Sequence, residues 1–391
     1  MIKLLIGGSP CTYWSIAQKN NRETTAEGLG WELFKNYLIA KEKFKPDFFL
    51  YENNKSAAQA IKDQIKNELG VWDGTLLMRD TGARYIEINS ALVSAQNRQR
   101  FYVHNCGEVG QPEDRGIMLS DILESGVTDK DKAYCLKHRG TGKADKARTL
   151  TAGYQTSSHR DFVADITSGG QLGHTGVIER VFPLNTTKDG KAQTIKAQYK
   201  FTSVQNICCY NSTYGALGVA MPATEQDKEK RKNAKNAIEK VYEVKNGYIT
   251  IKERQYAVNL PDGFYIIRKL TVAECCRLQT FPNDYCRAVS DSQAYKGLGN
   301  GWTAEVIIHI LRHALDFIPK NEKILVLSMY DGIGTGRYCL DKMGFTNVVY
   351  HAYEIDKYAM KIALSNYPDI IQHGDAFQVR DKEWNITTDL E

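Results

Sequence analysis

The sequence predicts an α/β fold, a doubly wound and mostly parallel sheet, with a small irregular domain inserted into it. Apolar runs of strand length alternate with helical patterns over residues 1–105 and again near the C-terminus. Between them, over residues 106–265, glycine, threonine and lysine are frequent and the strand patterns are short. We therefore expect three parts, residues 1–105, 106–265 and 266–391, of which the outer two build one sheet.

Composition and charge indicate a globular protein with reduced thiols. The 391 residues are 42% hydrophobic and 25% charged. No run of about 18 apolar residues occurs, so we expect neither a membrane span nor a leader peptide. Nine cysteines without a Cys-x-x-Cys pair argue against a disulfide framework and a structural metal site, and they favour a cytoplasmic setting. The net charge of +5 permits a polyanionic partner without requiring one.

The first apolar run, Leu4 to Ile6, ends in a glycine-rich turn that carries Pro10 and Cys11. This pattern predicts a buried strand that delivers one thiol to the end of a sheet. A thiolate is a strong nucleophile where its surroundings lower the thiol pKa, although a Pro-Cys pair is also typical of a buried structural cysteine. The polar segment from Thr12 to Gly30 has the composition of a mobile loop with glycine hinges.

Two charged patterns follow in the first part. A helix over 31–44 ends before Pro46, and a buried strand over 47–51 then delivers Glu52. A buried carboxylate is costly without a partner or a catalytic role, although Glu52 also suits the capping of a helix expected over 57–69. After a strand over 83–88, Arg98 and Arg100 share one strand face. Such a pair holds a phosphate or carbonyl, or belongs to a solvated edge strand.

The middle part offers two features that suit a polyanion. A helix expected over 224–241 carries a basic cluster that includes Lys228 and Lys232, which fits a phosphate backbone or a solvated helix face. Residues 146–154 resemble residues 191–199, so a pair of related β-ribbons is expected. Thr271 then caps a helix that carries Glu274, and a glycine-rich stretch over 297–302 precedes an apolar helix over 304–315.

The C-terminal part has the pattern of a βαβ nucleotide-binding unit. A buried strand over 324–328 leads into a glycine turn over 331–336, a helix over 337–343 and a second strand over 348–352. In such a unit the glycines let the backbone approach a ligand, and an acid about 20 residues later binds a ribose. Glu354 has that spacing from Gly334, and Asp375 follows a third strand near 370–371. Because such a unit normally opens its domain, we infer a circular permutation.

With its last block moved to the front, the chain resembles the DNA cytosine-5 methyltransferase family over residues 1–105 and 266–381. The resemblance rests on motifs in one cyclic order: residues 330–336, Glu354, Asp375, Pro10-Cys11, Glu52-Asn53-Asn54, Gln96-x-Arg98-x-Arg100, Arg268 to Pro282, and Gly299 to Trp302. The Gly8–Cys11 segment and Trp302 are similar to the de novo branch of that family. Thr12, Asn54 and Thr335 depart from the usual family residues without removing a catalytic group.

The resemblance implies a reaction and its catalytic residues. Cys11 adds to C6 of a flipped-out cytosine, so that C5 takes a methyl group from S-adenosyl-L-methionine. Glu52 holds the N3 and amino edge of the base. Arg98 and Arg100 grip its carbonyl and the adjacent phosphate, and they help to keep Cys11 as a thiolate.

The resemblance also implies a cofactor site and a DNA surface. Residues assigned to S-adenosyl-L-methionine are Pro10, Asn300, Trp302, Tyr330, Asp331, Gly332, Ile333, Gly334, Thr335, Gly336, Glu354, Ile355, Asp375 and Ala376. Residues assigned to DNA are Ser15, Arg22, Thr149, Thr151, Lys228 and Lys232. The expected partner is sequence-specific duplex DNA, bound by a monomer without metal or membrane, at the nucleoid of a bacterial or phage-infected cell. Two alternatives stay open: a tRNA cytosine-5 methyltransferase, and a catalytically silent DNA-binding module on the same fold.

Overall fold

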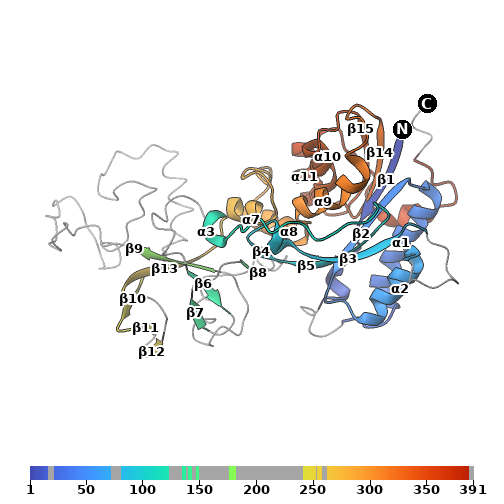
Figure 1. The fold of residues 1–391 in the computed structure, drawn as a ribbon. Coiled ribbons are helices and arrows are strands. Elements are labelled where there is room, and N and C mark those ends of the chain that lie inside the picture. Colours follow the sequence, from blue (N-terminus) through green and yellow to red (C-terminus); the bar gives the residue numbers. More distant parts are fainter. Residues whose placement is uncertain are drawn as a thin grey trace. The chain divides into compact units, whose positions relative to one another are not determined.

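The computed structural model describes residues 1–15, 22–71, 81–122 and 262–386, together with short stretches of the middle part at 134–137, 140–142, 147–148, 176–181, 241–251 and 253–257. The chain divides into two compact units (Figure 1). The larger unit includes Met1–Ile117 and Cys275–Glu391, and the smaller unit includes Met118–Arg148 and Thr156–Glu274. Within the described residues, no helix has the length and apolar character needed to span a bilayer.

A seven-stranded sheet forms the centre of the larger unit, in the order β16-β15-β14-β1-β2-β5-β3 (Figure 1). Its strands are β1 (Ile2–Gly7), β2 (Phe48–Asn54), β3 (Arg84–Asn89), β5 (Gln99–His104), β14 (Ile324–Met329), β15 (Val348–Tyr353) and β16 (Ile371–Gln372). The strands from β16 to β2 run parallel, whereas β5 is antiparallel to both β2 and β3. The predicted doubly wound, mostly parallel sheet is confirmed.

The two ends of the chain contribute neighbouring strands at the centre of this sheet. Residues Ile2 to Gly7 pair in register with Ile324 to Met329, and the amino terminus of Met1 forms an ion pair with Glu322. The C-terminal unit of β14, α10 (Thr335–Lys342) and β15 therefore extends the sheet that β1 begins. A circular permutation would produce this arrangement, and the permutation stays a prediction.

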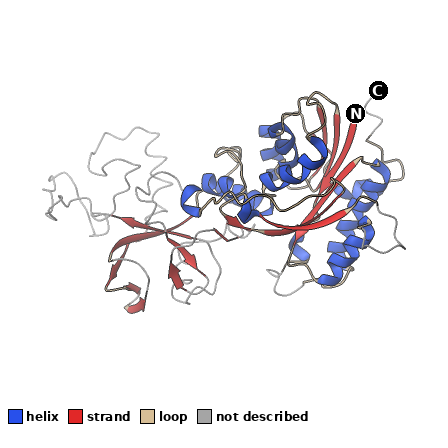
Figure 2. Cartoon of the chain, viewed as in Figure 1, coloured by secondary structure: helices blue, strands red, loops and turns tan. Residues whose placement is uncertain are grey.

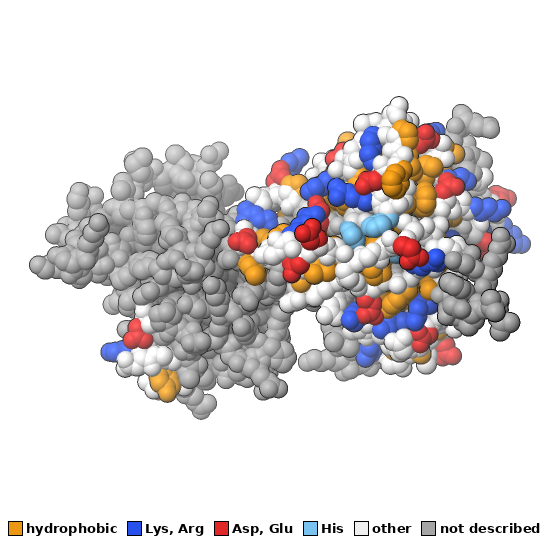
Figure 3. Space-filling view, in the orientation of Figure 1, with side chains coloured by type: hydrophobic (Ala, Val, Ile, Leu, Met, Phe, Trp, Pro, Cys, Tyr) orange, Lys and Arg blue, Asp and Glu red, His pale blue; other side chains and the backbone are white. Residues whose placement is uncertain are grey.

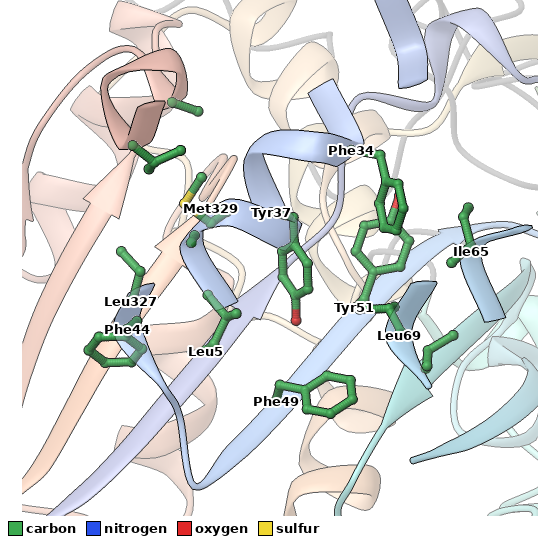
Figure 4. Packing of buried hydrophobic residues seen from close by; sticks show 14 of the residues in the cluster. Leu5, Phe34, Tyr37, Phe44, Phe49, Tyr51, Ile65, Leu69, Leu327 and Met329 are labelled. Carbon is green, nitrogen blue, oxygen red and sulfur yellow. The ribbon is translucent and has the colours of Figure 1, made fainter. Parts of the chain in front are cut away.

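Helices lie on both faces of the sheet (Figure 2). One face carries α1 (Gly28–Phe44) and α2 (Gln59–Leu69). Their residues Phe34, Tyr37 and Ile65 form one buried cluster with Leu5 and Tyr51 of the strands (Figure 4). The burial of such large apolar side chains is the main favourable term in the stability of this layer.

On the other face, α10 approaches the sheet very closely. A Cβ on Gly336 would lie 2.1 Å from Cδ1 of Ile6 and 2.4 Å from the hydroxyl of Tyr350. Only glycine therefore fits where α10 crosses β1 and β15. The other long helices of the larger unit are α8 (Asp291–Asn300), α9 (Ala304–Leu315) and α11 (Lys357–Asn366).

Short elements complete the described part of the larger unit: η1 (Cys11–Tyr13), η2 (Ser90–Leu92), η6 (Ala376–Arg380) and β4 (Gln96–Asn97). The mobile loop expected over residues 12–30 needs correction, because η1 occupies its start and Gly28 and Gly30 lie in the first turn of α1. The two glycines are part of a helix and are not hinges. Similarly, the glycines expected as a separate stretch over 297–302 mostly belong to the last turn of α8.

The described strands of the smaller unit form an antiparallel sheet of order β12-β11-β10-β13-β9-β6-β7. They are β6 (Tyr134–Lys137), β7 (Gly140–Gly142), β9 (Gly176–Val181), β10 (Val241–Lys245), β11 (Tyr248–Ile251), β12 (Arg254–Ala257) and β13 (Gly263–Lys269). The elements α3 (Leu119–Ile122) and β8 (Ala147–Arg148) also fall in this range, and α7 (Val272–Leu278) follows β13.

The predicted cap of α7 is confirmed. The backbone N–H of Glu274 donates to Oγ1 of Thr271 at 3.2 Å, and the N–H of Thr271 donates to Oε2 of Glu274 at 2.8 Å. This reciprocal pair is a capping box, which satisfies two backbone groups that the start of a helix leaves without partners.

Candidate active site

A cavity of about 460 Å³ lies in the larger unit where the parallel strands end. Its size is in the range of small-molecule sites, and the carboxyl ends of parallel strands are where such folds bind ligands. The cavity brings together most of the residues that the sequence assigned to catalysis and cofactor: Pro10, Glu52, Arg98, Arg100, Asn300, Trp302, Tyr330, Asp331, Gly332, Ile333, Thr335, Glu354, Ile355, Asp375 and Ala376. Gly334 and Gly336 are not among its lining residues: Gly334 lies close to Ala363 and Ile370, and Gly336, in α10, lies close to Ile6 and Tyr350.

The turn after β14 is held in an uncommon backbone conformation. Tyr330 has a φ of 62°, in the left-handed region that non-glycine residues rarely adopt, and Gly332 and Gly334 have φ values of 63° and 80°. The hydroxyl of Tyr330 donates to the carbonyl of Leu33 at 2.7 Å and accepts from Nδ2 of Asn36 at 3.2 Å. Both partners lie on α1, so the fold maintains this strained turn at the cavity wall.

Glu354 links this turn to the end of β15. Its Oε2 accepts the backbone N–H of Gly332 at 2.8 Å, and its Oε1 accepts those of Ile355 at 2.9 Å and Asp356 at 2.8 Å. The carboxylate is therefore fixed in position at the end of β15. Asp375 has a similar local role, since it precedes η6 and accepts the backbone N–H of Phe377 at 3.0 Å.

Asp331 presents a buried carboxylate at the same wall. Its Oδ1 accepts the hydroxyls of Ser328 and Tyr350, each at 2.7 Å, whereas its buried Oδ2 has no hydrogen-bond partner among the described residues. Burial raises the pKa of Asp331 to about 6, although the two hydroxyls oppose this change. An unpaired buried acceptor beside a cavity suits a ligand that brings a cationic or N–H donor.

Glu52, near the end of β2, is a second buried carboxyl that lines the cavity. It is 8% exposed, its Oε1 lies 2.9 Å from Nε of Arg100, and its Oε2 accepts the indole N–H of Trp302 at 3.0 Å. Burial raises its pKa, and Arg100, Arg98 and Trp302 partly oppose that effect. A carboxyl with a raised pKa can donate a proton to a ring nitrogen.

Both alternatives to a functional Glu52 and arginine pair are wrong. Glu52 does not cap α2, because that helix begins at Gln59 and its N-cap is Ala58. Arg98 and Arg100 do not belong to a solvated edge strand, because Arg100 is in β5, which lies between β2 and β3, Arg98 lies between β4 and β5, and both side chains are buried.

Arg98 is directed to the protein itself. It is 2% exposed, and its Nη2 donates to the carbonyls of Gly299 at 3.2 Å and Gly301 at 2.8 Å. These carbonyls flank Asn300 at the end of α8 and precede Trp302. Arg98 therefore fixes the turn that carries two of the predicted cofactor residues.

The segment that carries Pro10 and Cys11 is fastened to β2. Nδ2 of Asn53 donates to the carbonyl of Ser9 at 3.0 Å and to the hydroxyl of Tyr51 at 3.1 Å. The hydroxyls of Ser9 and Tyr51 are 2.7 Å apart. Cys11 opens η1 directly after this anchored stretch, between Pro10 and Thr12, which both line the cavity; the Cys11 side chain lies outside the described part of the chain.

Sequence reasoning missed an ion pair on the cavity wall. Nζ of Lys296, on α8, lies 2.7 Å from Oδ2 of Asp356, and Oδ1 of Asp356 caps α11 by accepting the N–H of Tyr358 at 2.9 Å. The signal was present in part, because Lys296 stands one helical turn before Asn300 and therefore shares its helix face. The pairing with Asp356 joins two distant segments and leaves no local pattern.

The residues assigned to DNA are only partly placed. Ser15 accepts a hydrogen bond from Asn54 at 3.3 Å, and Arg22 donates to the carbonyls of Trp14 at 3.2 Å and Ser56 at 2.5 Å. The other four, Thr149, Thr151, Lys228 and Lys232, lie outside the described residues. Of the two predicted ribbons, 146–154 and 191–199, the structure describes only residues 147–148. On the face seen in Figure 3, Lys and Arg of the larger unit are interspersed with Asp and Glu. Among the residues that the structure describes, no cluster of His, Cys, Asp and Glu is suited to a metal ion.

The fold and the cavity together define a class, a Rossmann-like protein with a site for a nucleotide-type cofactor. Comparison with known proteins gives the family. The model of the family described as C-5 cytosine-specific DNA methylase matches residues 1–315, so the chain belongs to this family. C-5 cytosine methyltransferases of the family use S-adenosyl-L-methionine, and the glycine turn, Glu354 and the unpaired oxygen of Asp331 fit such a group.

Individual known proteins are similar to this chain to different extents. Orphan methyltransferase M.SPRI of Bacillus phage SPR is 24% identical over 377 residues, which cover 80% of this chain and 82% of that protein. Type II methyltransferase M1.ScrFI of Lactococcus lactis subsp. cremoris is 41% identical over 56 residues, 14% of each protein. Among solved structures, a mutant of Spodoptera frugiperda DNMT2 is similar with 16% identity and a TM-score of 0.36, over 80% of this chain and 78% of that one.

Proposed function

We propose that the chain transfers the methyl group of S-adenosyl-L-methionine to C5 of cytosine in duplex DNA, with Cys11 as the nucleophile. The observation that carries this proposal is the shared cavity, in which Glu52 and the turn from Tyr330 to Gly332 line one space. A group that can protonate a base and a wall suited to the cofactor thus lie in one site, as direct transfer between the two requires.

In this mechanism Cys11 bonds to C6 of a flipped base while Glu52 donates a hydrogen bond or proton to N3. The raised pKa of Glu52 favours its protonated form, which can act as that donor. Arg100 orients Glu52 across 2.9 Å. After methylation, C5 loses its proton to water, the electrons of that C–H bond form the C5=C6 double bond and expel the Cys11 sulfur as a thiolate, and N3 returns its proton to Glu52.

The cofactor, when bound, supplies a methyl group on a positively charged sulfur. We propose that this chain holds it with the turn from Tyr330 to Gly334, with Glu354 and Asp375 at the ends of β15 and β16, and with Asn300 and Trp302. Arg98 keeps Asn300 and Trp302 in place through the carbonyls of Gly299 and Gly301.

The choice of duplex DNA is supported by the description of the family and by the names of its relatives, an orphan methyltransferase and a Type II methyltransferase. The proposal includes residues 106–265 as the part that recognises the target sequence, in a protein that acts as a monomer. A tRNA substrate and a silent DNA-binding module are the competing assignments.

Methyl transfer from labelled S-adenosyl-L-methionine to duplex DNA or to tRNA tests the proposal. Nucleoside analysis is expected to find label as 5-methylcytosine in DNA with the unaltered protein and none with Cys11→Ala. Cys106→Ala is the matched control, because Cys106 is a buried thiol outside the cavity. Label in tRNA alone would replace DNA by tRNA as the substrate. No label in either, with cofactor still bound, would identify a silent module.

A further inference from the structure

Glu23 joins two elements beside the cavity. Its Oε2 accepts the indole N–H of Trp14 at 3.0 Å, and its Oε1 accepts the backbone N–H of Gly30 at 3.2 Å. Its own backbone N–H donates to the carbonyl of Tyr13 at 2.8 Å. Trp14 follows η1, the turn that begins with Cys11, and Gly30 lies in the first turn of α1. This set of contacts, the Glu23 bridge, ties the turn to the helix.

The two glycines of α1 make room for the bridge. A Cβ on Gly28 would lie 2.6 Å from Oε1 of Glu23, and a Cβ on Gly30 would lie 2.6 Å from both Oε2 of Glu23 and Nε1 of Trp14. Side chains at these positions would displace the carboxylate. The Gly-x-Gly pattern at the start of α1 therefore leaves the space that the Glu23 carboxylate occupies.

The bridge also serves the start of α1 electrostatically. Glu27, the N-cap residue, makes no side-chain hydrogen bond to the helix. The carboxylate of Glu23 supplies the acceptor and the negative charge that the positive end of a helix favours. The same carboxylate therefore holds both Trp14 and the start of α1.

Neighbouring contacts connect the bridge to the cavity. The Trp14 side chain is 0% exposed and belongs to the buried cluster of α1 and α2, so the indole cannot turn away easily. Tyr13 and Leu29, which adjoin the bridge on its two sides, line the cavity. A change in the bridge is therefore expected to move the part of the cavity wall that Tyr13 and Leu29 form.

We propose that Glu23 is a positioning residue for methyl transfer: with Trp14 and Gly30 it holds the turn that begins at Cys11 in the orientation needed for attack on the base. This role rests on the proposed function, in which Cys11 is the nucleophile. The bridge involves Trp14, Gly30 and the carbonyl of Tyr13, whereas the turn of Tyr330, proposed to hold the cofactor, is bonded to Leu33 and Asn36 further along α1. Loss of the bridge therefore affects the chemical step and spares cofactor binding.

Glu23→Ala removes both acceptors of the bridge. It is expected to lower kcat for DNA methylation roughly 10- to 100-fold, because small misplacements of reacting groups have large effects on rate. The Kd for S-adenosyl-L-methionine without DNA, measured by calorimetry, is expected to stay within about two-fold of the unaltered value. Glu23→Gln keeps one acceptor oxygen, and its kcat is expected to lie between those of the unaltered protein and Glu23→Ala. Glu27→Ala is the control, since it removes a nearby acid that makes no cap contact.

A double-mutant cycle tests the contact itself. Trp14→Phe keeps an aromatic ring in the core and deletes the indole donor, so its effect and that of Glu23→Ala should be less than multiplicative. Trypsin cleavage after Arg22 gives a readout without activity. Trp14→Phe deletes the donor that holds the side chain of Glu23, the residue after Arg22, so this variant should be cut several-fold faster than Glu27→Ala.

Several results would overturn this role. They are a kcat of Glu23→Ala within about two-fold of the unaltered protein, a parallel loss of cofactor affinity, or fully multiplicative effects in the cycle. An unaltered protein that methylates nothing would overturn the proposed function and this role together. Normal methylation combined with an unaffected Glu23→Ala would overturn this role alone.

Discussion

The indole N–H of Trp302 donates to Oε2 of Glu52 at 3.0 Å, across 250 positions of the chain. Arg100 holds the other carboxyl oxygen from a distance of 2.9 Å. The first contact joins the turn after α8 to the end of β2, and the second joins β5 to β2. Glu52 is thus oriented from two sides, which suits a group that must meet one edge of a base.

Trp302→Phe is expected to move the pH dependence of methyl transfer. Burial raises the pKa of Glu52, and Arg100, Arg98 and the Trp302 N–H lower it, so deleting that N–H raises the pKa further. If protonated Glu52 serves the base, activity is present below this pKa and is lost as the pH rises through it. The alkaline limb of the kcat profile should therefore shift to higher pH. A shift to lower pH would contradict the role of Glu52, and Trp31→Phe, in the core cluster, should leave the limb in place.

Asp331→Asn is expected to stabilise the free protein at neutral and higher pH. Burial raises the pKa of Asp331 from 3.8 to about 6, so the ionised group opposes folding. This penalty is absent below about pH 4 and complete above about pH 6, where the difference in pKa corresponds to about 3 kcal/mol. Asparagine keeps an oxygen for Ser328 and Tyr350. Urea unfolding near neutral pH and in mild acid should show a gain that shrinks in acid, and an equal gain at both would contradict the assignment.

The same substitution should weaken the binding of the cofactor. If the unpaired Oδ2 of Asp331 accepts a donor from S-adenosyl-L-methionine, the amide of Asp331→Asn cannot replace it, and the Kd should rise roughly ten-fold. Calorimetry measures this directly. A variant that is more stable and binds as tightly as before would show that Oδ2 does not face the cofactor.

Arg98→Lys distinguishes between two roles for Arg98: fixing the turn of Asn300 and Trp302, and contacting the base. Lysine keeps the charge but cannot present one planar group to the carbonyls of Gly299 and Gly301. Because these carbonyls fix the turn of Asn300 and Trp302, we expect the Kd for S-adenosyl-L-methionine without DNA to rise roughly three- to ten-fold. An unchanged Kd with a reduced kcat would show that Arg98 acts on the base instead.

Local patterns predicted the C-terminal unit well. A buried run, a glycine turn and an acid at the right spacing are set by short-range chemistry, and β14, α10 and β15 lie within about two residues of their expected positions. The cap of α7 by Thr271 is local in the same sense. The apolar run before Glu52 likewise predicts a buried carboxylate, although it does not indicate the partner.

Contacts between distant segments could not be predicted. The pairing of Trp302 with Glu52 has no local signal, and Gly28 and Gly30 suit a hinge by composition although they open α1 around the carboxylate of Glu23. Arg98 suits a phosphate by type, yet the fold directs it to backbone carbonyls. For Glu52 and Arg98 the partner is fixed only when the fold brings segments more than 200 positions apart into contact. For Gly28 and Gly30 the partner Glu23 is only a few positions away, but it precedes the helix and makes no helical pattern with them.

Gly336→Ala is expected to destabilise the larger unit by about 3 kcal/mol, because its Cβ would overlap Ile6 and Tyr350 and force α10 away from the sheet. Urea unfolding measures this loss. Gly110→Ala is the control, since nothing lies near a Cβ at that position and the change should stay within about 0.5 kcal/mol. Equal stability of the two variants would contradict the close approach of α10.

Covalent trapping tests the central claim most directly. Duplex DNA whose cytosines carry fluorine at C5 lets Cys11 add to C6 and the methyl group be transferred, but no C5 proton remains to be removed, so the bond to sulfur persists. With S-adenosyl-L-methionine present, we predict a complex that survives detergent and contains the methylated base on the peptide of Cys11, and none with Cys11→Ala. An adduct that forms on fluorinated RNA but not on DNA, or one that persists in Cys11→Ala, would contradict the account.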